Sequence, residues 1–182
     1  MVIRESIIDV LRAIPDPEMP ISIVDLGLVE AVRVHSAANQ RDETSGSGTQ
    51  VEIDLLPTFI GCPALDMIAG DVRAKISRLP GVAQVKVNWV FDPPWSVDRI
   101  TPAGRESLRE HGVTVPAPGS GGRLSIPAHE SQQTVTLRTS AVPCPFCGSN
   151  STYLDSPFGP TRCRTIYYCE SCRNSFEHLK RV

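Results

Sequence analysis

Apolar residues follow helical and strand-like spacing through the first third of the chain. Residues 3–14 carry an apolar side chain at every third or fourth position, which predicts an amphipathic helix that ends before Pro15. Residues 28–35 are rich in valine, and residues 50–55 alternate apolar with polar side chains, so we expect two strands that pair as a hairpin. Residues 36–49 between them are polar and contain several Ser, Gly and Thr, which predicts a flexible connection.

A further helix, a strand and a short helix follow. Helical spacing over residues 65–79 predicts the first of these, and alternating Val, Trp and Phe over residues 85–91 predict a third strand. Thr-Pro at the start and Gly at the end of residues 101–112 predict a short capped helix. Residues 113–133 are rich in Pro and Gly and poor in apolar side chains, so we predict a linker that ends a first domain of residues 1–112.

Four of the six cysteines form two C-x-x-C turns near the C-terminus, with 21 residues between the turns. Each turn points two thiolates at one ion, and two turns complete a tetrahedral site. We predict a structural zinc ion in a ribbon of residues 134–182, although iron in a rubredoxin-like site uses the same geometry. The predicted ligands are Cys144, Cys147, Cys169 and Cys172. Cys163 and His178 lie outside the turns and receive no role.

These elements predict an α+β fold in which a small mixed sheet with flanking helices is followed by a C-terminal zinc ribbon. With 41% hydrophobic and 21% charged residues, the composition is that of a globular chain. A formal net charge of -2 gives no global attraction to nucleic acid or to an anionic membrane. Because no apolar run fits a secretion signal or a membrane span, we expect a cytoplasmic protein with reduced thiols and no membrane or nucleic-acid partner.

A single cysteine of the first domain stands at a chemically favourable place. Cys62 precedes Pro63, a residue suited to the first position of a helix. We therefore expect the Cys62 thiol at the helix N-cap, where the helix dipole lowers its pKa and makes it a good nucleophile or soft-metal ligand. The alternative is a small, buried apolar cysteine.

Acidic residues surround the predicted turn before the first strand. Asp16, Glu18 and Asp25 offer oxygen donors for a metal or for proton transfer, and they equally suit turns and caps. Glu52 and Asp54 fall on the polar face of a predicted strand, where we expect them to be solvated.

Three motifs resemble the SufT-type metal-sulfur cluster assembly domain, over roughly residues 1–112. They are PDPEMP at residues 15–20, IVDLGLV at 23–29 and PTFIGCPA at 57–64. The resemblance implies a role in assembling or delivering iron-sulfur clusters. The positions that it marks for handling iron or a cluster are Cys62, Asp16, Glu18, Asp25 and Thr58.

The ribbon and the run FGPTRCR at residues 158–164 resemble the PaaD family, so that the likeness covers nearly the whole chain. This resemblance implies an accessory protein, not an enzyme, that matures the iron or iron-sulfur centres of the multicomponent phenylacetyl-CoA monooxygenase. Its implied partners are the subunits of that monooxygenase and general iron-sulfur assembly proteins. Its implied cofactors are structural zinc and transient iron or an iron-sulfur cluster.

A single cysteine in the first domain cannot supply the four ligands of a cluster, so carriage of a cluster needs a second subunit, exogenous thiols or acidic co-ligands.

Two other functions stay open at this point. An enzyme with Cys62 as nucleophile lacks a histidine in the same motif to serve as its base. A non-catalytic adaptor could use the ribbon to bind the oxygenase complex or nucleic acid, which would leave Cys62 without a role.

Overall fold

The structure is a computed structural model that describes residues 4–35, 48–119 and 142–181. In these ranges the chain forms an α+β fold with two small sheets, one of three strands and one of four. The elements in chain order are α1 (Arg4–Arg12), β1 (Val29–His35), β2 (Thr49–Leu55), α2 (Leu65–Ile76), β3 (Val82–Trp89), the 3-10 turn η2 (Val97–Arg99), α3 (Pro102–Glu110), β4 (Val113–Thr114), β5 (Thr152–Ser156), β6 (Arg164–Cys169) and β7 (Ser175–Leu179).

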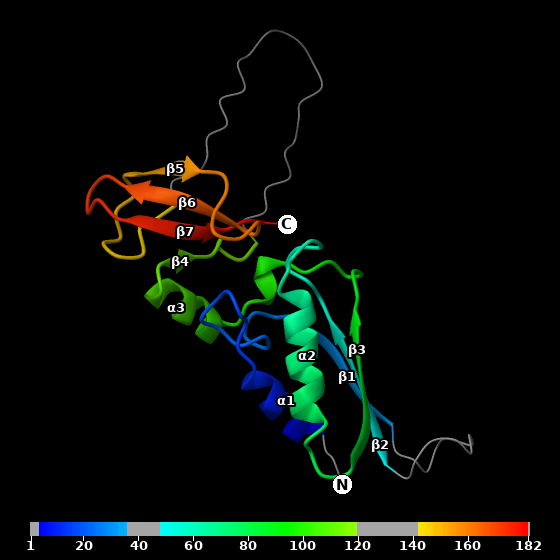
Figure 1. Cartoon of the computed structure of the whole chain (residues 1–182). Helices are drawn as coiled ribbons and strands as arrows, with labels where there is room; N and C mark the ends of the chain where they lie inside the picture. The colour runs from blue at the N-terminus through cyan, green and yellow to red at the C-terminus, as the bar shows by residue number, and fades with distance from the viewer. Residues whose placement is uncertain (1–3, 36–47, 120–141, 182) are drawn as a thin grey trace.

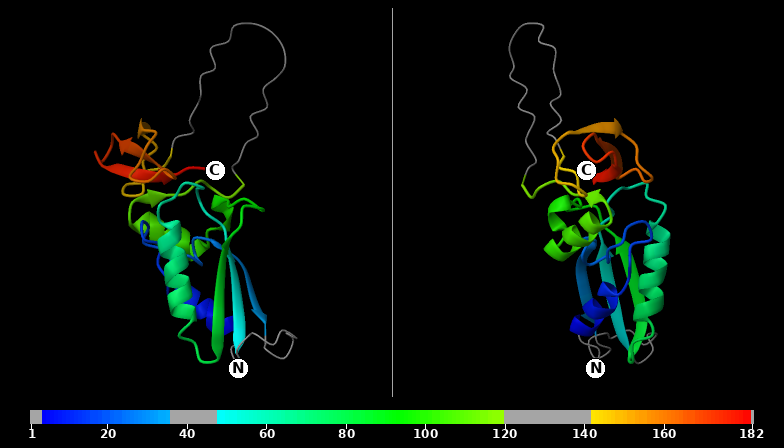
Figure 2. Two further views of the ribbon diagram at one scale, coloured as in Figure 1. Left: turned by 45° about the vertical axis from the view of Figure 1, so that its right-hand side comes forward. Right: turned by 90° about the vertical axis from the view of Figure 1, so that its left-hand side faces the viewer.

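The first sheet has the order β1-β2-β3 and is mixed, as predicted. β1 and β2 pair antiparallel, which confirms the hairpin, whereas β2 and β3 pair parallel because α2 crosses over between them. Both α1 and α2 lie on the same face of this sheet (Figures 1 and 2). The predicted flexible connection falls at residues 36–47, outside the described residues, except for its last two positions, of which Thr49 begins β2.

Alternation along β2 divides the sheet into an apolar and a polar face. Val51, Ile53 and Leu55 are fully buried in one cluster with Leu11 of α1 and Val72 of α2. Side chains of a strand point alternately to its two faces, so every second residue of β2 faces the helices. Each helix in turn presents one apolar face, formed by residues three or four positions apart. The helix-covered face of the first sheet is therefore the main hydrophobic core.

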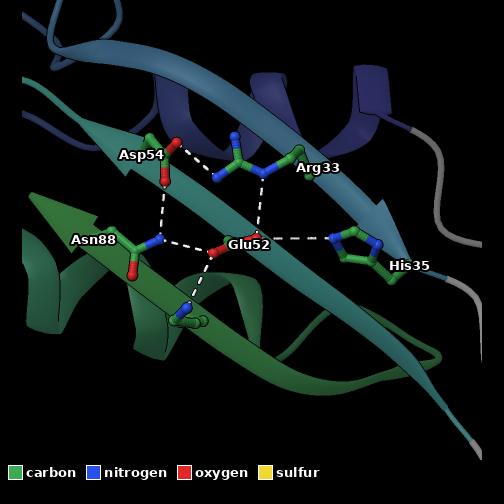
Figure 3. Close-up of polar contacts among 6 residues, drawn as sticks. Arg33, His35, Glu52, Asp54 and Asn88 are labelled. Atoms are coloured by element: carbon green, nitrogen blue, oxygen red, sulfur yellow. Dashed lines mark hydrogen bonds and ion pairs between the residues drawn. The ribbon is translucent and has the colours of Figure 1, made fainter. Parts of the chain in front are cut away.

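The opposite face of the first sheet carries a connected set of polar side chains (Figure 3). Arg33 donates to Glu52 at 3.2 Å and to Asp54 at 2.6 Å, and the Asn88 amide donates to both carboxylates at 2.9 Å. Hydrogen bonds from Asn88, Arg33 and Lys86 lower the pKa of Glu52 to about 2. The expectation that Asp54 is solvated is wrong, since only 9% of the residue is exposed.

Near the end of the first domain, the structure confirms one predicted element and changes the boundary of another. The helix α3 begins as expected, with the Thr101 hydroxyl accepting from the Gly104 amide at 3.0 Å, and Gly112 follows it with a positive φ of 76°. The third strand ends at Trp89, and Phe91 lies beyond it with 54% of its surface exposed.

Among the described residues, no helix has the length and apolar character needed to span a bilayer.

The second sheet has the order β4-β7-β6-β5 and includes a strand that the sequence assigns to the linker. Val113 and Thr114 form β4 and pair parallel with Glu177 and His178 of β7. The linker therefore does not begin at Val113, because this residue is 4% exposed and packs in the main core. The rest of the predicted linker from residue 120, and the first residues of the predicted ribbon to 141, lie outside the described residues.

Apolar residues of the ribbon complete the main core. Leu179 at the end of β7 is fully buried, and Cys163 just before β6 is 7% exposed; both belong to the large cluster built by the first sheet. A smaller cluster around Tyr167 and Phe176 belongs to the ribbon alone. In Figure 1 the second sheet lies beyond one end of the first, next to α3. The two parts of the chain therefore share a packed junction.

We expect Leu179→Ala to destabilise the first domain as well as the ribbon, by about 2–4 kcal/mol, because it leaves a cavity in the shared core. Both tryptophans, Trp89 and Trp95, lie in the first domain, so urea unfolding followed by their fluorescence reports that domain. The control Leu154→Ala changes a side chain that is 38% exposed and should shift stability by less than about 1 kcal/mol. An unchanged tryptophan transition in Leu179→Ala would show that the junction is not energetically coupled.

Candidate functional site

The four predicted zinc ligands converge at one point of the ribbon. Their sulfur atoms all lie within 4.8 Å of one another, and the Cys144–Cys172 and Cys147–Cys169 sulfur pairs are each 3.6 Å apart. A tetrahedral zinc ion with Zn–S bonds of about 2.3 Å requires sulfurs about 3.8 Å apart. The donor set therefore fits a closed, structural zinc ion with no free coordination position.

Each C-x-x-C turn ends in the same backbone conformation. The residue after each second cysteine has a positive φ, 72° at Gly148 and 60° at Arg173. The Gly148 amide donates to the Cys144 carbonyl at 2.9 Å, and the Arg173 amide donates to the Cys169 carbonyl at 2.8 Å. Glycine adopts this conformation without steric cost, whereas Arg173 accepts some strain to keep the second turn closed.

Neighbouring amides prepare Cys172 for metal ligation. Desolvation would raise the pKa of this thiol, but hydrogen bonds from the backbone and side-chain amides of Asn174 and from the thiols of Cys144 and Cys147 outweigh it and lower the pKa to about 6. A metal binds the thiolate and not the thiol, so this polar support favours the ligand form.

A second candidate site is a pocket of about 200 Å³ between the first domain and the ribbon. The loop from β2 to α2 contributes Cys62, the turn after α1 contributes Glu18, and the loop before β6 contributes Cys163. In Figure 1 the loop between β2 and α2 lies at the end of the first sheet that faces the ribbon. A larger hollow of about 940 Å³ between α3, β4 and the first C-x-x-C turn contains none of the residues predicted to handle iron.

The expected N-cap position of Cys62 is wrong. α2 begins at Leu65 and its N-cap is Ala64, so Cys62 lies two residues before the cap. Burial raises the pKa of the Cys62 thiol, and the charges of Glu18, Asp16 and Cys163 raise it further, against one hydrogen bond from the Ala64 amide. The thiol is therefore protonated at neutral pH, and a bound cation would be needed to favour the thiolate.

Asp16 and Glu18 both lie near Cys62. The Glu18 amide donates to the Asp16 carboxylate at 2.8 Å, which fixes the turn that carries both acidic residues. Burial raises the pKa of Asp16, because its carboxylate is removed from water more than this hydrogen bond compensates. Glu18 lines the pocket itself.

Asp25 and Thr58 occupy other places. The two carboxylate oxygens of Asp25 accept from the hydroxyls of Ser22 and Thr101, each at 2.8 Å. This carboxylate therefore ties the turn before β1 to the start of α3. Thr58 is 8% exposed and, like Asp25, is absent from the lining of the Cys62 pocket. The structure thus brings Cys62, Glu18 and Asp16 together, and it does not bring Asp25 or Thr58 to the pocket.

Comparison with known proteins identifies both parts of the chain. Residues 4–89 match the family described as "Iron-sulfur cluster assembly protein", and residues 128–180 match the "PaaD zinc beta ribbon domain". A protein of Escherichia coli (strain K12), named as one subunit of a "Putative 1,2-phenylacetyl-CoA epoxidase", is 36% identical over 93% of this chain and 88% of its own length. The chain belongs to the PaaD family.

Relatives of the first domain alone carry names from iron-sulfur protein maturation. The "Fe-S protein maturation auxiliary factor" of Porphyromonas gingivalis (strain ATCC BAA-308 / W83) is 35% identical over 54% of this chain and 83% of its own length. The "Fe-S protein maturation auxiliary factor SufT" of Staphylococcus aureus (strain USA300) is 34% identical over 47% of this chain and 85% of its own length. This PaaD-family chain therefore combines an iron-sulfur assembly domain with a zinc ribbon.

Sequence reasoning assigned no role to Cys163, which the PaaD-family fold places in the same pocket as Cys62. The residues are 101 positions apart, so no local spacing connects them. The only signal was that Cys163 falls inside the run at residues 158–164, which carries the PaaD resemblance.

His178 joins the PaaD-type ribbon to the first domain through β4. Its Nδ1 lies 2.8 Å from the Thr114 hydroxyl, and its ring packs edge-on against Tyr167 with ring centroids 5.5 Å apart. Burial lowers the pKa of His178 to about 4, and the positive charge of Arg181 adds to the effect. The folded protein therefore holds a neutral imidazole at the junction.

We expect the stability of the protein to fall as the pH is lowered from about 6.5 to about 4. In this range His178 becomes protonated in the unfolded chain but stays neutral in the folded protein, so acid favours unfolding. After allowance for partial exposure, the His178 contribution is roughly 1–2 kcal/mol. His178→Gln should remove that part of the pH dependence in urea unfolding, while the non-titratable control Leu154→Ala keeps the wild-type profile. Acid also protonates the cysteines of the predicted zinc site, and this effect is the same in all three proteins. Equal slopes of unfolding free energy against pH for His178→Gln and wild type would therefore contradict the lowered pKa of His178.

Proposed function

We propose that this chain is a non-catalytic accessory protein that binds iron or an iron-sulfur cluster transiently at Cys62 and passes it to the multicomponent phenylacetyl-CoA monooxygenase. The observation that carries the proposal is the pocket in which Cys62 lies beside Glu18 and close to Asp16. The names of two kinds of relative support the proposal. Relatives of the first domain are named as Fe-S maturation factors, and a relative that matches nearly the whole chain is named as an epoxidase subunit.

The chemistry of the pocket suits a cation that is held only briefly. Sulfur and carboxylate donors together accept ferrous iron, and the acidic neighbours that raise the pKa of Cys62 would attract a positive ion. The ion would displace the thiol proton and stabilise the thiolate. A site with fewer than four protein ligands leaves positions for ligands of the client, so the cargo can leave by ligand exchange.

The residues that line the pocket give Cys62 no histidine or lysine partner for nucleophilic catalysis. They include cysteines, a carboxylate and an arginine. A nucleophilic cysteine normally has a lowered pKa, and the pKa of Cys62 is raised in spite of the arginine. These features favour a binding role over an enzymatic one.

Large apolar side chains near the pocket favour a protein as the recipient. Ile60, two residues before Cys62, is 76% exposed, and Phe158, in the loop before β6, is 73% exposed. Exposed apolar side chains of this size often mark a protein-binding surface. Because the zinc set is closed, we propose that the ribbon contributes shape and contact surface and that zinc does not take part in transfer.

Removal of this chain from a matured monooxygenase tests accessory maturation against a permanent adaptor role. The client is co-expressed with the chain and then separated from it by a stringent wash of a tagged client. Maturation predicts that the stripped client keeps its iron and its turnover. A client that loses turnover with its iron intact, and regains it when zinc-loaded, iron-free chain is added back, would instead identify an adaptor subunit and overturn the proposal.

A further inference from the structure

We propose that Cys163 of the ribbon is a second sulfur ligand of the Cys62 site, so that two thiolates from opposite sides of the junction hold the metal with help from Glu18. This inference rests on the proposed function for the identity of the cargo, but its two-thiol geometry stands on separate observations. It assigns the ribbon a direct part in the iron site in addition to its zinc-bound scaffold.

Several contacts bring the two cysteines to one pocket. Cys62 and Cys163 both line it together with Glu18; Cys163 belongs to the main hydrophobic cluster, and Cys62 packs against that cluster. The two thiols are near enough to interact electrostatically. Next to Cys163, the Arg162 guanidinium lies 6.0 Å from the centre of the Phe59 ring, three residues before Cys62. The loop before β6 therefore lies directly against the loop before α2.

Hydrogen bonds within the loop and to the end of β7 hold the loop that carries Cys163. The Gly159 amide donates to the Arg164 carbonyl at 2.9 Å, and a side chain at Gly159 would come within 3.1 Å of that backbone. The Cys163 carbonyl accepts from the Lys180 amide at 2.8 Å, beyond the end of β7. Because β6 begins directly after Cys163, pairs with β7 and ends at the predicted zinc ligand Cys169, the ribbon holds this thiol in position.

A chain of hydrogen bonds holds the Cys163 side chain in place. The Thr161 hydroxyl lies 3.1 Å from the Cys163 sulfur and accepts a hydrogen bond from Arg164 Nε at 2.8 Å. With its oxygen engaged by the guanidinium, the hydroxyl has its own hydrogen available for the sulfur. Arg164 is only 6% exposed and also pairs with Glu177. Buried donors of this kind orient a metal ligand.

The pocket needs a small rearrangement to close on an ion. Among the residues that the structure describes, only the four zinc cysteines have three or more ligand atoms mutually within 4.8 Å. The two pocket thiols and Glu18 therefore include at least one pair of ligand atoms farther apart than that. Rotamer changes of these side chains would bring the ligands together, and two protons would leave to solvent as two thiolates form.

Cobalt binding to the zinc-loaded full chain tests the second sulfur. Under anaerobic, reducing conditions, Co²⁺ bound by thiolates gives near-ultraviolet charge-transfer absorption that Zn²⁺ does not give. The wild type should bind one further Co²⁺ with this absorption. Cys163→Ser and Cys62→Ser should each lose about half of its intensity and bind Co²⁺ roughly 10-fold or more weakly, since each removes one soft ligand. Pro160→Ala changes the same pocket without removing a ligand and should resemble the wild type.

The possible outcomes separate the two proposals. If Cys163→Ser matches the wild type while Cys62→Ser loses the absorption, Cys163 is only a packing residue and the proposed function of Cys62 survives. If no variant differs from the wild type, or the wild type shows no thiolate absorption, both proposals fail. Zinc content and the tryptophan unfolding transition confirm that each variant is folded.

A second measurement needs no variant. Phenylarsine oxide bridges two thiols that share one site, with loss of water, and zinc protects the ribbon cysteines. Peptide mass analysis of the treated, zinc-loaded chain should find the arsenic bridge between the peptides that contain Cys62 and Cys163. Separate labelling of the two thiols, with no bridged product, would overturn the two-thiol site.

Discussion

Cys169→Ser should lose the bound zinc and the strand structure of the ribbon, while the first sheet with α1 and α2 stays folded. Cys169 is fully buried at the start of the second C-x-x-C turn, and its sulfur forms one corner of the predicted tetrahedron. Structural zinc contributes about 10–16 kcal/mol to the folding of small zinc domains, more than the stability of most whole domains. Loss of one ligand should therefore unfold a segment whose own core is a single small cluster.

The unfolding of the ribbon should also reach the first domain. Leu179 and Cys163 would leave the main core, and β4 would lose its partner β7. We expect the tryptophan-monitored melting temperature to fall by roughly 5–15 °C. The matched control Ser171→Ala, within the same turn, should keep zinc and lose only a hydrogen bond to Ser149.

Elemental analysis and amide NMR spectra measure the two effects of Cys169→Ser. Less than half an equivalent of zinc or iron in the wild type, together with a folded ribbon, would contradict the metal assignment. An unchanged melting temperature of the first domain in the variant would restore the view of two independent cores joined by a linker.

The sequence predicted those parts of the fold that depend on local pattern. The helix α1, the β1–β2 hairpin and the helix α2 follow from spacing within single segments. The convergence of the four C-x-x-C cysteines was also predictable, because a C-x-x-C turn presents two sulfurs through its own backbone geometry. In each case the residues that make the feature are close in sequence or repeat a recognisable turn.

The parts that could not be predicted depend on contacts between distant segments. β4 is only two residues long, and it becomes a strand because β7 offers a partner more than 60 residues later. The raised pKa of Cys62 reflects burial and the charges of Glu18, Asp16 and Cys163, and Cys62 lies outside the helix end that Pro63 led us to expect. Asp54 is buried because residues of both neighbouring strands close over it. No periodicity within one segment reports such tertiary effects.

Replacing Cys62 by Ser should leave the chain folded and zinc-loaded but unable to mature its client. Cys62 is only partly buried and its thiol takes part in no zinc contact, so the oxygen-for-sulfur change should cost little stability. It does remove the soft ligand that the proposed transfer requires. Cells that carry only this variant should grow poorly on phenylacetate and normally on a carbon source that bypasses the pathway.

The most direct test is the iron content of the monooxygenase isolated from cells that express Cys62→Ser in place of the wild type. Wild type and Ser171→Ala serve as controls with an intact pocket, and the zinc content of each chain shows that the ribbon is loaded. We predict client with several-fold less iron and proportionally lower turnover in the Cys62→Ser cells, and normal values in both controls. Full iron occupancy and normal turnover of the client from Cys62→Ser cells would contradict the account, because Cys62 would then be a packing residue and not part of a transfer site.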